Sequence, residues 1–154
     1  MKLITIKSVL IYVLVGVTSL AAGSCCTKVF CLDANNIEMI YFYNFTVNEL
    51  DTISIKLYDK NTNFASAIDS VLVITSDLRS QSPFQTIFVP DRITHHLDYK
   101  IRLNATGQEF TVSDFIITKE KCNSGFLCND FFNALESYKI NGQTVTSNTL
   151  AITK

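Results

Sequence analysis

The stretch YKIRLNATGQEFTV, at positions 99–112, contains the clearest signal for the fold. Apolar and charged residues alternate from Tyr99 to Leu103, and the segment NATG follows as a turn. Apolar residues then recur at Phe110, at position 112 and at Ile117. Alternation with a period of two predicts a strand that is buried on one face only. The stretch therefore predicts an antiparallel β-hairpin.

The same kind of pattern predicts further strands along the chain. These lie at 37–46, 52–58, 71–75, 84–89, 138–140, 143–145 and 150–152. The first has apolar residues on both faces, which predicts burial on both sides, or nearly so, whereas 52–58 alternates strictly and should be half-buried. Asn141-Gly142 is the strongest two-residue hairpin signal in the chain.

One short helix is also predicted, at 129–136, with Asn129 as its cap. Residues 64–68 are ambiguous between a helical turn and an irregular edge. About seven or eight short strands with little helix predict a single antiparallel β-sandwich of immunoglobulin-like or transthyretin-like type. We therefore expect an all-β fold.

The N-terminal segment has the layout of an export signal. Lys2 and Lys7 precede a mostly apolar run at 8–22, and small residues lead directly to Cys25. The apolar run is shorter than the span of about 20 residues that a permanent membrane helix needs. A cysteine in this position predicts a lipoprotein signal peptide, with cleavage before Cys25 and a lipid on its thiol. Cys26 as the modified residue, a secreted chain without lipid and an uncleaved anchor are the alternatives.

These predictions divide the chain into a signal peptide at 1–24, a lipidated tether at 25–36 and a β-sandwich domain at 37–154. Removal of the signal leaves 130 residues, the size of one domain. This mature chain has 11 basic and 14 acidic residues, so its formal charge is −3. Because nucleic-acid binding needs a concentrated basic face, the charge does not favour it.

Five cysteines, all after the leader, are typical of an exported protein in an oxidising compartment. If Cys25 carries the lipid, the four that remain allow three pairings. Cys122 and Cys128 are close in sequence, and we predict a disulfide between them. Free thiols, or a pairing with Cys31 or Cys26, are the alternatives.

No motif points to catalysis. The two histidines, His95 and His96, are adjacent, and we predict that they lie in an exposed loop and bind no metal ion. The glycines of the mature chain are isolated, so no phosphate-binding loop is predicted. We therefore expect neither a cofactor nor an enzymatic activity. The many Tyr and Phe residues would suit a carbohydrate platform, but aromatic residues in alternating strands are more typical of a core.

Several segments resemble a group of small lipoproteins of Bacteroidetes bacteria. They are SCCTK at 24–28, the strand and turn at 43–53, DYKI at 98–101 and the segment 135–142. The resemblance implies a β-rich envelope protein on a lipid anchor. Members on the cell surface often carry an acidic pair soon after the lipidated cysteine, where this chain has Lys28 and Asp33. An outer-membrane anchor facing the periplasm is therefore at least as well supported as surface display.

These observations predict a membrane-anchored envelope lipoprotein that acts as a binding or accessory module. Its expected partners are the membrane, through the lipid, and an envelope protein or a glycan. A purely structural envelope component is the alternative. An exposed aromatic or apolar patch would favour a binding module. A polar surface without such a patch would favour a structural component, and a deep polar pocket would favour an enzyme.

Overall fold

The computed structural model describes residues 31–75, 82–122 and 130–154. The chain divides into two compact units, one of residues 31–120 with 132–154 and the other of residues 1–30 with 121–131. The predicted signal peptide, Cys25, Cys26, Cys128 and Asn129 lie outside the described residues. Among the described residues, no helix has the length and apolar character needed to cross a membrane.

The described residues form strands and one short 3₁₀ helix. In chain order they are β1 Ile37–Tyr43, η1 Val47–Leu50, β2 Thr52–Asp59, β3 Ala67–Ile74, β4 Phe84–Ile93, β5 Leu97–Leu103, β6 Glu109–Lys121, β7 Phe131–Ile140, β8 Gln143–Thr146 and β9 Leu150–Thr153. The predicted hairpin corresponds to β5 and β6, and the Asn141-Gly142 turn joins β7 to β8.

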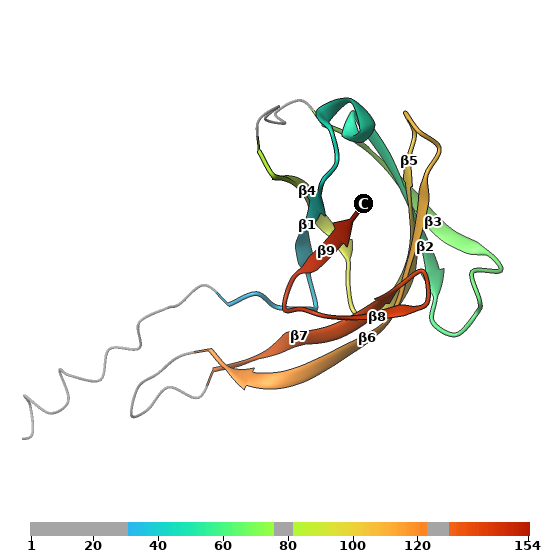
Figure 1. The fold of residues 1–154 in the computed structure, drawn as a ribbon. Coiled ribbons are helices and arrows are strands. Elements are labelled where there is room, and N and C mark those ends of the chain that lie inside the picture. The colour runs from blue at the N-terminus through green and yellow to red at the C-terminus, as the bar shows by residue number, and fades with distance from the viewer. Residues whose placement is uncertain (1–30, 76–81, 123–129) are drawn as a thin grey trace, which may run out of the picture. The chain divides into compact units, whose positions relative to one another are not determined.

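The strands belong to two sheets that face each other (Figure 1). The small sheet has the order β4-β1-β9, and the large sheet has the order β3-β2-β5-β6-β7-β8. This arrangement confirms the predicted all-β sandwich. In the small sheet, β1 and β9 run parallel, whereas β1 and β4 run antiparallel. β9 reaches the small sheet after the chain leaves β8 in the large sheet, so a hairpin does not set its direction.

The core lies between the inner faces of the two sheets. The small sheet contributes Ile40 and Phe42 from β1 and Ile152 from β9, all fully buried. The large sheet contributes alternate residues of β2, β5 and β6, which are Ile53, Ile55, Leu57, Tyr99, Ile101, Leu103, Phe110 and Val112. Burying each such side chain stabilises the fold by about 1.5–3 kcal/mol. This alternation explains why the sequence period predicted these strands.

Two core tyrosines place their hydroxyl groups on backbone atoms. The Tyr138 hydroxyl accepts a hydrogen bond from the Ala151 amide at 2.8 Å and lies 3.1 Å from the carbonyl oxygens of Thr149 and Ala151. The Tyr99 hydroxyl bonds to the amide and the carbonyl of Thr94 at 2.7 and 3.0 Å. Burial raises the pKa of both phenols. Tyr138 thereby fastens β7 of the large sheet to β9 of the small one.

Two predictions of local structure were wrong. The described part of the predicted helix at 129–136 belongs to β7, because a helix of that length is marginal alone and the segment instead joins the ladders of the large sheet. The segment 37–46 is not buried on both faces, since Ile40 and Phe42 are buried whereas Tyr43 is exposed. No further layer among the described residues covers the outer face of β1.

Two cysteines among the described residues, Cys31 and Cys122, are disulfide-bonded. Cys122 directly follows β6, and its amide bonds to the carbonyl of Asp130. A disulfide that includes Cys31 is one of the alternatives that the sequence left open. The predicted Cys122–Cys128 pair includes Cys128, which lies outside the described residues, and it stays a prediction.

Candidate functional site

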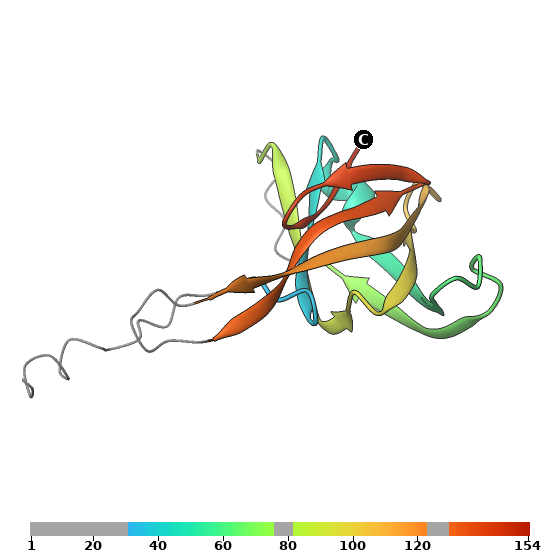
Figure 2. The same ribbon diagram turned by 90° about the horizontal axis from the view of Figure 1, so that it is seen from below.

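The outer face of the small sheet carries a group of aromatic side chains. Met39, Tyr41 and Tyr43 alternate along β1, opposite Phe88, Thr86 and Phe84 of β4 respectively. Side chains of alternate residues point to one side of a sheet, and the residues between them, such as Ile40 and Ile87, are buried inside. We call Met39, Tyr41, Tyr43, Phe84 and Phe88 the aromatic face. Figure 2 shows β1 and β4 of this sheet from below.

The aromatic residues contact one another along the surface. The ring centroids of Tyr43 and Phe84 lie 5.6 Å apart, and those of Tyr41 and Phe84 lie 6.2 Å apart. The Tyr41 hydroxyl is 3.8 Å from the Met39 sulfur. Phe88 remains 58% exposed, Phe84 41% and Tyr43 37%. The rings therefore support one another while a large part of their apolar surface stays in contact with water.

The aromatic face has no charged residue among its positions. Among the paired positions 39–43, 84–88 and 150–153, the other outward residues are Thr86, Ala151 and Thr153. Aromatic residues and Met are enriched, and charged residues depleted, in the buried centre of protein–protein interfaces. Exposed apolar patches on folded domains mark sites of interaction. The chemistry of this face is therefore suited to binding an apolar surface.

Sequence reasoning assigned these aromatic residues to the core. The available signal was the presence of apolar residues on both faces of 37–46, which was interpreted as burial on both sides. The same pattern arises when a strand has one buried face and one exposed face that binds a partner. Sequence period alone does not separate these cases, because it reports which side chains share a face and not what covers that face.

A hollow of about 350 Å³ lies on the large sheet. It is lined by Lys60, Asn61, Asp114, Phe115, Ile116, Ser137, Tyr138, Lys139 and Thr144. The ammonium group of Lys139 lies 2.8 Å from a carboxylate oxygen of Asp114, so these opposite charges already pair within the protein. The aromatic face is the stronger candidate site, because two of the three charged groups that line this hollow already neutralise each other.

A buried carboxyl group, that of Asp98, lies beside this hollow. Burial raises its pKa, while hydrogen bonds from the backbone amides of Asn61 and Asp114 oppose the rise. One of its oxygens, Oδ1, has no hydrogen-bond partner in the part of the chain that the structure describes. Asn61 and Asp114 have positive φ angles of 62° and 53°, a conformation that costs energy in residues other than glycine. Asp98 therefore has a structural role, since it holds two strained segments in place.

The two histidines lie together but not as predicted. His95 is buried, and its backbone amide and ring Nδ1 lie 3.0 and 3.1 Å from the carbonyl oxygen of Ala34. His96 is exposed, with its ring centroid 3.7 Å from that of His95. The prediction of exposure was therefore wrong for His95, whose imidazole lies against the Ala34 carbonyl group. Within the described ranges, no group of three or more His, Cys, Asp or Glu side chains could hold a metal ion.

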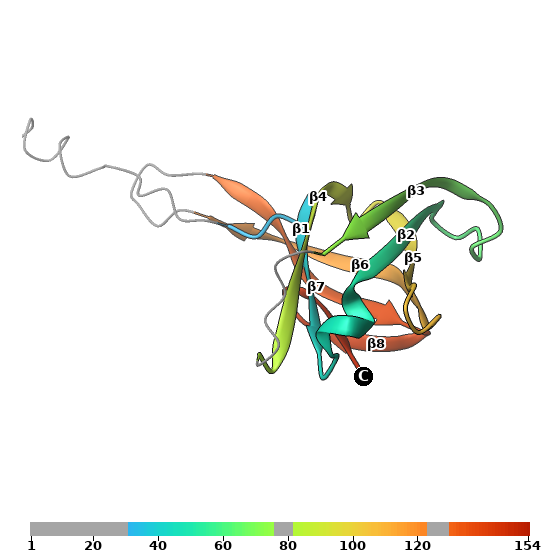
Figure 3. The same ribbon diagram turned by 90° about the horizontal axis from the view of Figure 1, so that it is seen from above.

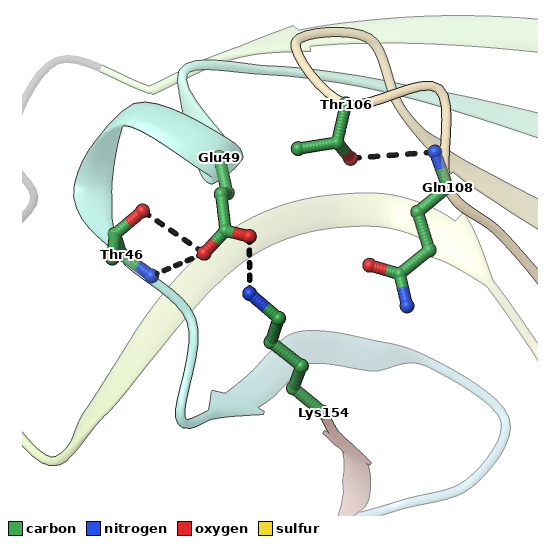
Figure 4. Close-up of polar contacts among 5 residues, drawn as sticks. All are labelled: Thr46, Glu49, Thr106, Gln108 and Lys154. Atoms are coloured by element: carbon green, nitrogen blue, oxygen red, sulfur yellow. Dashed lines mark hydrogen bonds and ion pairs between the residues drawn. The ribbon is translucent and has the colours of Figure 1, made fainter.

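Glu49 of η1 lies at the centre of a polar cluster with Thr46 and Lys154 (Figure 4). The Lys154 ammonium group donates to its Oε1 at 2.6 Å, and the amide and hydroxyl of Thr46 donate to its Oε2 at 2.8 and 2.9 Å. These hydrogen bonds, the one from Lys154 above all, lower the pKa of Glu49 from 4.5 to about 2. Thr106 and Gln108, also drawn, bond only to each other in this view. The cluster fastens the end of β9 to η1, a structural task.

Comparison of the chain with protein-family models, with curated proteins and with solved structures gave no match. No family therefore supplies a role for these residues. The functional argument rests on the chemistry of the aromatic face.

Proposed function

We propose that this protein is an envelope lipoprotein, anchored through Cys25, whose β-sandwich domain binds a partner protein through the aromatic face. The observation that carries the proposal is the exposure of Tyr43, Phe84 and Phe88 on one face of the small sheet. A fold with no partner gains nothing by leaving three large rings in water, because burying apolar area is worth about 25 cal/mol per Å². A protein partner is favoured over a glycan because Met39 joins the rings and no charged side chain occupies the face.

Site-specific photocrosslinking in intact cells tests the binding function. A photoreactive phenylalanine analogue at Phe88 should join the full-length protein to one partner of discrete mass. The same analogue at Phe64, an aromatic residue of the β2–β3 loop whose ring packs on Tyr58 of the large sheet, is the matched control. The crosslink should disappear when Phe84→Ser is combined with the analogue at Phe88.

Three outcomes would contradict a protein-binding face. They are the same products from Phe64 and Phe88, no product from either position, and a product removed by excess oligosaccharide. The last of these would assign the face to glycans instead.

The anchor is tested separately from the binding face. Cells supplied with a fatty-acid probe should label the wild-type protein and not the Cys25→Ser variant, because Cys25 directly follows the small residues of the leader. Equal labelling of the two chains would remove the lipid from the proposal but leave the aromatic face untouched.

A further inference from the structure

β3 forms one edge of the large sheet. In the part of the chain that the structure describes, β3 has β2 on one side and no strand on the other (Figure 3). Three of its large apolar residues, Ile68, Leu72 and Ile74, are 53%, 59% and 73% exposed. The residues opposite Leu72 and Ile74 on β2 are the polar Ser54 and Thr52. The exposed apolar stripe therefore follows the edge strand itself.

This edge lacks the features that usually prevent strand pairing. Proteins protect exposed edges with Lys, Pro, bulges or very short strands. β3 has eight residues, contains neither Lys nor Pro, and has one charged residue, Asp69. Its irregularity lies near Ile68, where the register with β2 shifts between Leu57 and Tyr58. From Asp69 to Ile74 the strand is regular, and a regular apolar edge is a template for another strand.

We propose that β3 pairs with β3 of a second copy of this chain, antiparallel, on a two-fold axis through Leu72. Outward side chains must lie opposite outward side chains if the two sheets are to continue as one. With the axis at Leu72, each Leu72 lies opposite the partner's Leu72, and each Val71 lies opposite the partner's Val73. Apolar residues thus pair on both faces at the centre, and pairs of this kind stabilise sheets.

The positions of the two Asp69 carboxylates also favour an axis at Leu72. With the axis at Leu72, each Asp69 lies opposite the partner's Thr75 and is separated from the partner's Asp69 by six residue steps, about 20 Å. This separation is about twice the screening length of roughly 8 Å at physiological ionic strength, so the two carboxylates do not repel strongly. An axis at Val71 would instead place Asp69 opposite an apolar valine. The side chains of β3 are therefore complementary to those of a second, antiparallel copy of β3.

Light scattering of the full chain, purified in a mild detergent, tests the proposal. The wild type should have the mass of a dimer. Leu72→Lys and Leu72→Glu should each be monomeric, because the axis would bring two like charges face to face. An equimolar mixture of the two variants should form the dimer again, because Lys then lies opposite Glu. Phe88→Lys, on the aromatic face, is the control and should remain dimeric.

The result is interpretable because Leu72 is exposed, so both substitutions should leave the fold intact, which circular dichroism and thermal unfolding check. A monomeric wild type, a dimeric Leu72→Lys variant or a mixture that stays monomeric would each overturn the proposal. The partner-binding function is independent of it. A monomeric Leu72→Lys chain that still crosslinks from Phe88 would uphold both proposals. A dimeric wild type that gives no crosslink from Phe88 would uphold the β3 pairing and contradict the partner-binding function.

Discussion

Aromatic residues on the outer faces of the two sheets differ in their exposure to solvent. On the large sheet, the outward ring of Tyr58 is buried because Phe64 packs on it, edge to face, at 5.3 Å. The Lys100 ammonium group lies 5.7 Å from the centroid of the Tyr58 ring and 5.4 Å from that of Phe64. On the small sheet, no loop or cation among the described residues covers the rings of Phe84 and Phe88, which remain exposed.

The outer faces of the two sheets also differ in their charged residues. The large sheet places Lys56, Lys100 and Arg102 next to one another on neighbouring strands, and Lys100 lies 3.7 Å from Glu109. On the small sheet, the paired positions 39–43 of β1 and 84–88 of β4 hold no charged residue. The comparison shows that this fold is able to cover an outward aromatic residue with a loop and a cation. The absence of that cover on the aromatic face is therefore the feature that suggests a site.

The largest expected effect contrasts phenylalanines on the two sides of the small sheet. Phe42→Ala should lower the free energy of unfolding by about 3–5 kcal/mol, because Phe42 is fully buried and the change leaves a cavity. Phe88→Ala should change it by no more than about 0.5 kcal/mol, because Phe88 is largely exposed. Urea unfolding of both variants measures the difference. Equal losses would mean that Phe88 is part of the core.

The second prediction concerns partner binding. Phe84→Ser with Phe88→Ser should weaken binding by about 2 kcal/mol or more, roughly 30-fold, because aromatic residues at the centre of an interface contribute most of its energy. Phe64→Ser, on the large sheet, should leave the affinity unchanged and instead reduce stability. Titration of the purified partner against each variant measures both. Loss of affinity in the Phe64→Ser chain would mean that the partner binds at the large sheet and not at the aromatic face.

The third prediction tests the hydrogen bond by which Tyr138 of the large sheet contacts β9 of the small sheet. Tyr138→Phe should destabilise the fold by about 1–3 kcal/mol, because the Ala151 amide loses the oxygen to which it donates. Partner binding should not change at saturating concentration, because Tyr138 is fully buried and lies in the large sheet. Thermal unfolding and the crosslinking assay measure the two quantities. A change in the crosslink without a loss of stability would contradict this division of roles.

The smallest effect should be the pH dependence contributed by Glu49. Its pKa is lowered in the folded state, so its contribution to stability is complete above the unfolded value of 4.5 and is lost as the pH falls toward about 2. Glu49→Gln should remove that dependence and lower stability at pH 7 by about 1 kcal/mol, as loss of a capping side chain does. Glu109→Gln, in an exposed pair, is the control and should cost less.

Much of the fold could be predicted from local pattern. The alternation at 99–112 predicted β5, β6 and the turn between them, and Asn141-Gly142 predicted the β7–β8 turn. Asn141 and Gly142 both have positive φ angles, 50° and 80°, as the two-residue turn requires. The shift of the apolar positions from Phe110 and Val112 to Phe115 coincides with Asp114, whose φ is 53°. An extra residue at that point turns the following side chains to the other face.

The sequence by itself determined which residues form strands and which of them share a face, because both depend on the period of the chain. Only the tertiary structure decided what covers each face. It left Phe88 exposed, buried His95 against the Ala34 carbonyl group and brought Cys31 into a disulfide. These outcomes depend on segments far apart in the sequence and on where the sheets stop, and a local period contains no record of either.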